Sequence, residues 1–318
     1  MIEHILVPLD GSSLAECVLP HAVAMGQATG AEVTLLQVLE RESDQVQSRA
    51  VDPLDWHMVK SEAASYLGEV ESRLQEVDLK TSRAIVEGRP AERIIDYIHQ
   101  ENVDLVILSS HGNSGLSKWN ISSVVQKVLL GSYTTTMIVR AFQPVLEDLD
   151  GLSYDRVLIP LDGSQRAEYI LPWATDMAKF HHCTMYLAHV VSRPEVPRNV
   201  PLTEKESDLV KQLTELNRVK GEQYLADVKS RFSSDVKTYI RVNDNTAAAL
   251  HKIVEEEDVD LVLMTAHGYS GETKWPYGGV ALNFIAYGTT PLLIFQDVPP
   301  EDASMTLAEK VAREQKGH

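Results

Sequence analysis

Short apolar runs recur along the chain and are separated by longer stretches with a helical period. In the first half these runs are ILVPL (5–9), VTLLQV (33–38), LVILS (105–109) and TMIVR (136–140). Each run is continuous rather than alternating, which is typical of strands buried on both faces of a parallel sheet. With helical patterns between the runs, the order β-α-β-α-β-α-β predicts an α/β fold with an open, doubly wound parallel sheet.

The first helical pattern, SLAECVLPHAVAMGQATG at 13–30, carries its own boundary signals. Glu16 stands three residues after Ser13, which predicts a capping box at the start. Gly30 predicts the end of the helix, and Pro20 predicts a bend, because proline removes a backbone donor. Further helices are predicted at 89–103, where Pro90 suits the first turn, and at 56–76 and 205–231, where the pattern is longer and amphipathic.

The second half of the chain repeats the first. HILVPLDGSSLAE aligns with RVLIPLDGSQRAE at a shift of 162 − 10 = 152, measured at Asp10 and Asp162. ENVDLVILSSHGNSG aligns with EDVDLVLMTAHGYSG at a shift of 267 − 111 = 156. Two long segments that match in the same order indicate an internal duplication. We therefore predict a first domain at 1–147, a second domain at 153–297 and a C-terminal tail at 298–318.

The charge and the cysteine content limit the classes of partner and site that are expected. The 318 residues carry 29 Lys and Arg against 46 Asp and Glu, a net charge of −17. Nucleic acids and anionic membranes attract clustered basic residues, so neither is expected as a partner. Two cysteines without a CxxC motif predict neither a disulfide framework nor a zinc site. The N-terminus lacks a signal-peptide pattern, and a cytoplasmic location is expected.

Ligands of doubly wound sheets bind beyond the carboxyl ends of the strands, where the strand order reverses. In each repeat this rule selects the end of the first strand, the end of the second strand and the loop after VDLVIL or VDLVLM. The loop sequences are SSHGNSGLSKWNISSVV (109–125) and TAHGYSGETKWPYGGV (265–280). A strand, a loop of small residues and a helix start are the parts of a phosphate-binding site.

Four features, each present twice, resemble the universal stress protein family in its tandem two-domain form. They are VPLDGS or IPLDGS, LLQV or LAHV, VDLVIL or VDLVLM before a His-Gly pair, and the closing TTTMIV or TTPLLIF. The resemblance implies two domains of the adenine nucleotide alpha hydrolase-like fold, related by a pseudo-twofold axis. It also implies that their last strands pair to form an internal pseudo-dimer. Whether this unit forms a further homodimer stays open.

The family contains a branch that binds ATP through G-x2-G-x9-G-[S/T] and a branch without that pattern. In this chain the pattern falls on Ser109, Gly112 and Ser122-Ser123, and on Thr265, Gly268 and Gly278-Gly279. Neither repeat fits fully, because serine or threonine replaces the first glycine in both. A Cβ there is expected to cost about 1–3 kcal/mol if the position needs strained geometry. The second loop is expected to be the better phosphate site, since two glycines leave bare N–H groups.

The resemblance implies that the first-strand Asp and second-strand Val face the ribose and base, while the small loop residues face the phosphates. The candidate nucleotide-binding residues are Pro8, Leu9, Asp10, Val38, Gly112, Ser122, Ser123, Pro160, Leu161, Asp162, Val190, Gly268, Gly278 and Gly279. The candidate cofactor is ATP or another adenine nucleotide, with Mg²⁺ as a possible companion, and the alternative is no ligand. No metal-binding or catalytic residue is predicted.

Each candidate has a structural alternative. Asp10 and Asp162 are either ribose ligands or the acceptors of Asx-type turns. The small residues at 122–123 and 278–279 either bind an anion or only begin a helix. His111 and His267 are interpreted as turn residues rather than catalytic bases. Trp119 and Trp275 either cover the loop or an interface, or stack on a base.

Three functions remain open from the sequence. The leading hypothesis is a non-enzymatic stress-response module that binds or senses a nucleotide. A weak nucleotide hydrolase would need a metal ion and a positioned water, for which only Asp10, Asp162 and the two loop histidines are candidates. A nucleotide-free scaffold would use the long helices at 56–76 and 205–231 as partner surfaces.

Overall fold

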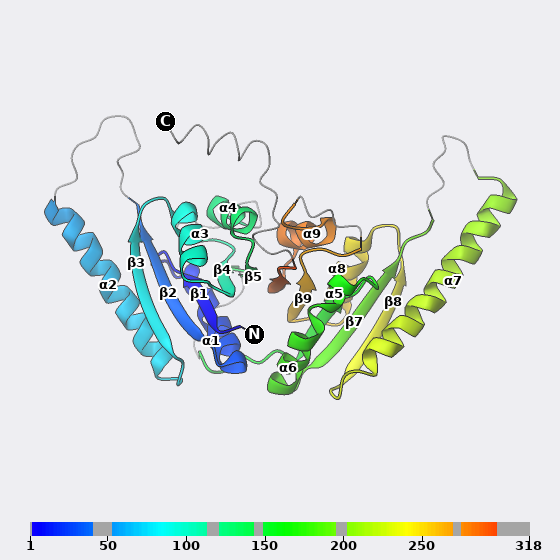
Figure 1. Ribbon diagram of the computed structural model, residues 1–318, viewed down its shortest axis with the longest axis horizontal. Coiled ribbons are helices and arrows are strands. Elements are labelled where there is room, and N and C mark those ends of the chain that lie inside the picture. Colours follow the sequence, from blue (N-terminus) through cyan, green and yellow to red (C-terminus); the bar gives the residue numbers. More distant parts are fainter. Residues whose placement is uncertain are drawn as a thin grey trace. The chain divides into compact units, whose positions relative to one another are not determined.

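The computed structural model describes residues 2–40, 53–112, 121–142, 149–194, 202–269 and 275–297. The chain divides into two compact units, the first centred on Met1–Leu152 and the second on Ser153–Gly271 with Gly278–Ile294. The C-terminal tail at 298–318 and Trp119 lie outside the described residues. Figure 1 shows the helices and strands of both units.

The first unit is a five-stranded sheet with the order β3-β2-β1-β4-β5. The registers between β1, β2, β3, β4 and β5 are all parallel. Its strands are β1 (His4–Pro8), β2 (Glu32–Leu39), β3 (Thr81–Glu87), β4 (Leu105–Ser109) and β5 (Thr135–Val139). Its helices are η1 (Ala15–Val18), α1 (Leu19–Thr29), α2 (Pro53–Gln75), α3 (Pro90–Gln100) and α4 (Ser123–Ser132).

The second unit repeats this arrangement with the order β8-β7-β6-β9-β10. Its strands are β6 (Arg156–Pro160), β7 (Thr184–Val191), β8 (Val236–Val242), β9 (Leu261–Thr265) and β10 (Leu292–Phe295). Its helices are α5 (Gln165–Glu168), α6 (Leu171–His181), α7 (Glu204–Lys229), α8 (Thr246–Glu256) and α9 (Gly279–Tyr287). The predicted doubly wound parallel fold is confirmed in each unit.

The continuous apolar runs form strands that are buried on both faces, as expected. Ile5, Leu6 and Val7 of β1 are each 0% exposed, and so are Val157, Leu158 and Ile159 of β6. Helices cover the two faces of the first sheet: Gly26 of α1 lies against Val33 and Gly68 of α2 against Arg83, whereas Tyr97 of α3 interacts with Thr34. Neighbouring residues of a strand point to opposite faces, so α3 lies opposite α1 and α2.

The predicted element order was wrong in one respect, because each unit has five strands rather than four. The missed strands, β3 and β8, stand at the end of their sheet order and pair with one neighbour only. Their sequences, TSRAIVE and VKTYIRV, mix charged and apolar residues, and no residue of β3 is fully buried. An edge strand with one half-exposed side does not need a continuous apolar run.

The start of the first helix also differs from the prediction. Ser12, not Ser13, supplies the cap: its Oγ accepts from Ala15 N–H at 3.1 Å. Glu16 forms no capping box but pairs with Arg73 at 2.9 Å. A short 3₁₀ segment, η1, precedes α1, whose first turn contains Pro20. The predicted end is confirmed, because Gly30 has a φ of 71° and follows the last turn.

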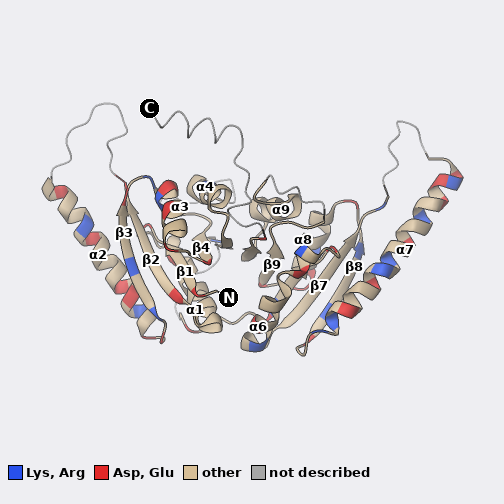
Figure 2. Ribbon diagram, in the orientation of Figure 1, with Lys and Arg blue, Asp and Glu red and all other residues tan. Residues whose placement is uncertain are grey.

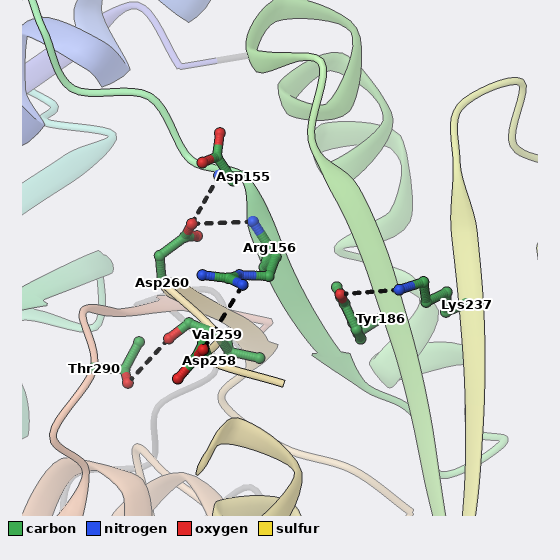
Figure 3. Close-up of polar contacts among 8 residues, drawn as sticks. All are labelled: Asp155, Arg156, Tyr186, Lys237, Asp258, Val259, Asp260 and Thr290. Carbon is green, nitrogen blue, oxygen red and sulfur yellow. Dashed lines mark hydrogen bonds and ion pairs between the residues drawn. The ribbon is translucent and has the colours of Figure 1, made fainter. Parts of the chain in front are cut away.

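A repeated aspartate fastens the amino-terminal edge of each sheet. Asp260 Oδ2 accepts from the backbone N–H groups of Asp155 and Arg156 at 2.8 and 3.0 Å, as Figure 3 shows. Asp104 makes the same two bonds with Glu3 and His4, at 2.8 and 3.0 Å. The Asp of both VDL motifs therefore serves the fold, at the edge opposite the carboxyl ends of the strands. Burial raises the pKa of Asp260, against these two hydrogen bonds.

The long helices are charged along most of their length. Figure 2 shows basic and acidic residues mixed on both α2 and α7. Within α7, Arg218 pairs with Glu215 at 2.7 Å and with Glu222. Thr203 and Glu206 form a complete capping box at its start. Among the helices in the described ranges, we find none whose length and apolar character would let it cross a membrane.

One buried histidine makes the stability of the first unit depend on pH. His21 of α1 is 8% exposed, and burial lowers its pKa to about 4. The unfolded chain, with a histidine pKa near 6.5, takes up a proton that the folded state excludes. Stability is therefore complete above about pH 6.5 and falls as the pH drops, by about 2 kcal/mol at about pH 5.

Urea unfolding of the first unit near pH 7.5 and near pH 5 measures this loss. In the variant His21→Gln the difference between the two pH values should shrink by about that amount. A difference of the same size in the variant and the wild type would show that other groups cause the pH dependence.

Candidate functional site

The strand order of each unit reverses between β1 and β4, or between β6 and β9. Doubly wound sheets bind ligands beyond the carboxyl ends of the strands at this switch point, which we call the crevice. Asp10 follows β1, and Ser109 ends β4. In the second unit Asp162 follows β6, and Thr265 ends β9. The fold therefore brings the first-strand and loop residues that were predicted from the sequence to one place in each unit.

In the second unit, β7 extends beyond the end of β6. The part of β7 beyond that end presents one backbone N–H donor and one C=O acceptor side by side. Leu161 N–H donates to Ala188 O at 2.8 Å, where β6 has just ended. Val190, two residues further along β7, directs its N–H and C=O to the same side as Ala188, because neighbouring residues alternate. The alternation is visible in Val191, whose carbonyl accepts from Asn243 on the other side at 3.1 Å. The equivalent residues of the first unit are Leu9, Leu36, Val38, Leu39 and Gly88.

The first-strand aspartates connect two loops. Asp162 Oδ1 accepts from Ser164 N–H at 2.9 Å and from Ser164 Oγ–H at 2.6 Å. Asp162 Oδ2 accepts from Tyr269 N–H at 2.5 Å, across the crevice. Asp10 Oδ1 makes the same turn with Ser12, at 3.0 and 2.6 Å. The Asx turn is therefore present in both units, and in the second unit the other oxygen of Asp162 is bonded to the loop after β9.

Gly112 and Gly268 are required for space rather than for an unusual backbone conformation. A Cβ at Gly268 would overlap Asp162 Oδ2, and a Cβ at Gly112 would overlap Asp10 Oδ2. Neither glycine is among the described residues with a positive φ. The middle glycine of the pattern thus lets the aspartate approach the loop backbone.

Ser109 and Thr265, which replace the first glycine of the pattern, are not strained. Their backbone φ values are not positive, and their side chains are 9% and 8% exposed. The condition for the predicted penalty, a strained backbone, is therefore not met at either position. Instead, Ser109 Oγ–H donates to His111 O at 2.6 Å, and Thr265 Oγ1–H donates to His267 O at 2.8 Å.

The helix starts after the two loops differ in their caps. Ser122 Oγ accepts from Val125 N–H at 3.3 Å and so caps α4. Gly278 begins α9 without any side-chain cap, and a Cβ at Gly279 would meet nothing within 4 Å. Ser122 N–H and Gly278 N–H are held by the carbonyls of Ser110 and Ala266, at 2.8 and 2.7 Å. Of the two helices, α9 is therefore the one that begins without a side-chain cap and with open space at its first residue.

The remaining predicted residues have simpler positions. Pro8 and Pro160 end β1 and β6, while the side chains of Leu9 and Leu161 are 4% and 3% exposed and belong to the core. His111 and His267 are buried at 3% and 2% exposure, and His111 Nδ1 shares a hydrogen bond of 3.1 Å with Ser110 Oγ.

Sequence reasoning missed a cluster that occurs in both units. Glu168 of α5 pairs with Arg231 at 2.5 Å, just as Glu16 pairs with Arg73. Burial and the nearby glutamate raise the pKa of Tyr224, and Asp162 adds to the effect. In the first unit, burial raises the pKa of Tyr66 in the same way, and Glu16 and Asp10 add to the effect. The cluster fastens the long helix beside the aspartate loop, and the equal shifts 224 − 66 = 158 and 231 − 73 = 158 could have revealed it.

The two units differ at the residue before the second-strand valine. His189 Nδ1–H donates to Leu161 O at 2.8 Å, because a carbonyl oxygen can only accept. Gln37 occupies the equivalent position in the first unit, since 189 − 37 = 152. The carbonyl of Leu161, directly after β6, is thus hydrogen-bonded to the side chain of His189.

Comparisons with known proteins agree with this duplicated architecture. The model of the universal stress protein family matches residues 1–140 and again residues 153–296. A universal stress protein of Methanocaldococcus jannaschii, MJ0577, is 30% identical over 161 residues, which cover 46% of this chain and 94% of the relative. That relative therefore corresponds to about half of this chain.

Two solved structures match nearly the whole chain. A universal stress protein from Archaeoglobus fulgidus covers 94% of this chain and 100% of its own, with 20% identity and a TM-score of 0.63. The functionally unknown protein PA1789 from Pseudomonas aeruginosa covers 98% of both chains, with 15% identity and a TM-score of 0.65. These likenesses concern the fold. With both halves matched by its family model, the chain belongs to the universal stress protein family and carries two such domains in tandem.

Proposed function

We propose that this stress-response protein is a non-enzymatic module that binds an adenine nucleotide at the carboxyl end of each sheet, with the stronger site in the second unit. The observation that carries the proposal is the pair of features facing one crevice. Val190 offers a backbone donor and acceptor beyond the end of β6, and α9 begins without a side-chain cap.

The valine backbone favours adenine over guanine. Adenine has an amino donor at N6 next to the N1 acceptor, which complements one C=O and one N–H. Guanine has the opposite order on that edge, an O6 acceptor next to an N1–H donor. Two mismatched bonds are costly, because a bound base shields these backbone groups from water and each mismatch leaves a polar group unsatisfied. Val38 offers the same pair of groups in the first unit.

The start of α9 suits a phosphate. The first N–H groups of a helix have no partner within the helix, and its dipole favours negative charge. At α4 the Ser122 hydroxyl already takes one of these N–H groups. At α9 the cap position is occupied by Gly278, which has no side chain to take such a group, and Gly279 leaves open space beside the backbone. A chain with a net charge of −17 can bind an anion here because the donors are backbone groups.

Asp162 lies between the two ends of the site and suits a ribose hydroxyl. Its carboxylate accepts three hydrogen bonds, from Ser164 N–H, Ser164 Oγ–H and Tyr269 N–H. A carboxylate has about four lone-pair positions. One acceptor position is therefore left for a hydroxyl donor without breaking the bonds that hold the loops.

Calorimetric titration of the full chain with ATP, AMP and GTP tests the proposal. ATP is expected to bind, with AMP weaker because it lacks the phosphates that reach α9. GTP is expected to bind at least tenfold more weakly than ATP, a difference of about 1.4 kcal/mol. Equal affinity for ATP and GTP would exclude recognition by the valine backbone.

An absence of heat with all three nucleotides at millimolar concentration would overturn the nucleotide function. The scaffold function would then be the better account, and α7 supplies the observation that favours it. Leu209, Leu213 and Leu216 of this helix are 57%, 47% and 48% exposed. They recur at helical spacing and form an apolar stripe that a partner could cover.

A further inference from the structure

Both units carry a hydroxyl where the nucleotide-binding pattern has its first glycine. Thr265 Oγ1–H donates to His267 O at 2.8 Å, and Ser109 Oγ–H donates to His111 O at 2.6 Å. The two residues differ, yet the hydroxyl, the acceptor two residues on and the burial recur, although Ser109 Oγ also lies 2.9 Å from a second acceptor, Leu14 O, and 3.4 Å from Cys17 Sγ. A bond that recurs in both halves of a diverged duplication calls for a shared explanation.

The hydroxyl closes a turn that faces the start of the following helix. Between Thr265 and His267 lies Ala266, whose carbonyl accepts from Gly278 N–H at 2.7 Å. In the first unit Ser110 O accepts from Ser122 N–H at 2.8 Å. Because the hydroxyl bond spans the residue whose carbonyl anchors the helix start, it also fixes the direction of that carbonyl.

The same turn is held at its far end by the first-strand aspartate. Tyr269 N–H donates to Asp162 Oδ2 at 2.5 Å, and Gly268 between them has no room for a side chain. Residues 265–269 are therefore fastened at both ends, by Thr265 to their own backbone and by Asp162 to the loop after β6. Without the hydroxyl, the turn would keep the Asp162 bond and the Ala266–Gly278 bond but would lose the bond that closes it at residue 265.

We propose that Thr265, at the position of the first glycine of the pattern, is a positioning residue. Its hydroxyl makes the turn rigid, and the turn sets the position of the start of α9. The proposal rests on the nucleotide function above. Ser109 performs the same role for α4. The hydroxyl acts through Ala266 and Gly278 and has no contact with the ligand.

This role separates the phosphate end of the site from the base end. The base would bind Val190, which pairs with Arg241 of β8, and β7 itself pairs with β6 as far as Ala188. Neither pairing involves residues 265–269. Loss of the hydroxyl should therefore lower the affinity for ATP and leave the affinity for adenosine unchanged. A hydroxyl with a purely structural role would lower both affinities together.

The test uses the full chain with Thr265→Val, which removes the hydroxyl at nearly constant volume, and Thr265→Ser, which keeps it. In Thr265→Val the affinity for ATP, measured by calorimetry, should fall about tenfold while the affinity for adenosine changes less than about twofold. Thr265→Ser should retain both affinities. An equal loss for ATP and adenosine, or an equal loss in the serine variant, would overturn the proposal.

A second readout needs no nucleotide. Native-state hydrogen exchange of the Tyr269 amide reports on the turn, because that amide is bonded to Asp162. Exchange should speed up about tenfold or more in Thr265→Val and stay unchanged in Thr265→Ser. Unchanged exchange in the valine variant would refute the positioning role. If the wild type binds no nucleotide, the proposed function fails, while this measurement still decides whether the hydroxyl holds the turn.

Discussion

Replacing Gly279 by aspartate is expected to lower the affinity for ATP by about a hundredfold or more. The new carboxylate would stand at the first turn of α9, where a Cβ meets nothing within 4 Å. Phosphates a few ångströms away would be repelled by about 3 kcal/mol, if the effective dielectric constant is near 20. That energy corresponds to about two orders of magnitude in affinity.

The same change should not harm the fold. Aspartate is favourable near a helix N-terminus, by about 0.3–1 kcal/mol, and it replaces a glycine, which is a poor helix former. Calorimetry with ATP and urea unfolding of the same preparation measure the two effects. Weaker binding together with equal or higher stability would assign the loss to charge at the helix start.

Two variants control for this interpretation. Gly279→Asn has nearly the same size without the charge and should change the affinity by less than about tenfold. Ser123→Asp places the charge at the equivalent position of α4, in the capped and weaker site. If Ser123→Asp removed most of the binding and Gly279→Asp removed little, the ranking of the two sites would be reversed.

Gly268→Ala and Gly279→Ala are expected to act in opposite directions although the chemical change is identical. At Gly268 the added methyl overlaps the Asp162 carboxylate. Relief of this overlap must displace the aspartate or the loop, at a cost of about 1–3 kcal/mol. Because Asp162 also lies at the proposed ribose position, the affinity for ATP should fall as well.

At Gly279 the methyl enters open space and lies in the first turn of a helix. Alanine there is expected to be neutral or to stabilise by up to about 1 kcal/mol. Urea unfolding of both variants provides the comparison, and Gly112→Ala repeats the first case beside Asp10. Equal effects of the alanine at positions 268 and 279 would contradict the steric account of the middle glycine.

Much of the fold was predictable because its signals are local or repeated. The runs at 5–9 and 33–38 are mostly apolar and do not alternate, which is typical of a strand covered on both faces. Gly30 and Pro90 mark a helix end and a helix start through their own backbone preferences. The internal duplication then tested each assignment twice, at Asp10 and again at Asp162.

The parts that could not be predicted depend on the position of an element in the sheet or on a single backbone turn. Strands β3 and β8 stand at the end of the strand order, so burial does not demand a continuous apolar run. Ser12 and Ser13 are chemically identical, and only the turn at Asp10 decides which of them caps the helix.

At the site, residue types were easier to predict than their partners. Asp162 follows a strand, as the sequence predicted, but its bond to Tyr269 joins residues 107 positions apart. Thr265 looked like an obstacle because the sequence does not tell where a hydroxyl points. Its acceptor, the carbonyl of His267, appears only when the turn is known.

The most direct measurement is a crystal structure of the full chain grown with ATP. The proposed function predicts nucleotide density in the second unit, with the adenine edge on the N–H and C=O of Val190 and the phosphates at the start of α9. Density in the first unit should be weaker or missing. A crevice that stays empty in both units at millimolar ATP, or a nucleotide whose base does not contact Val190 or Val38, would contradict the account.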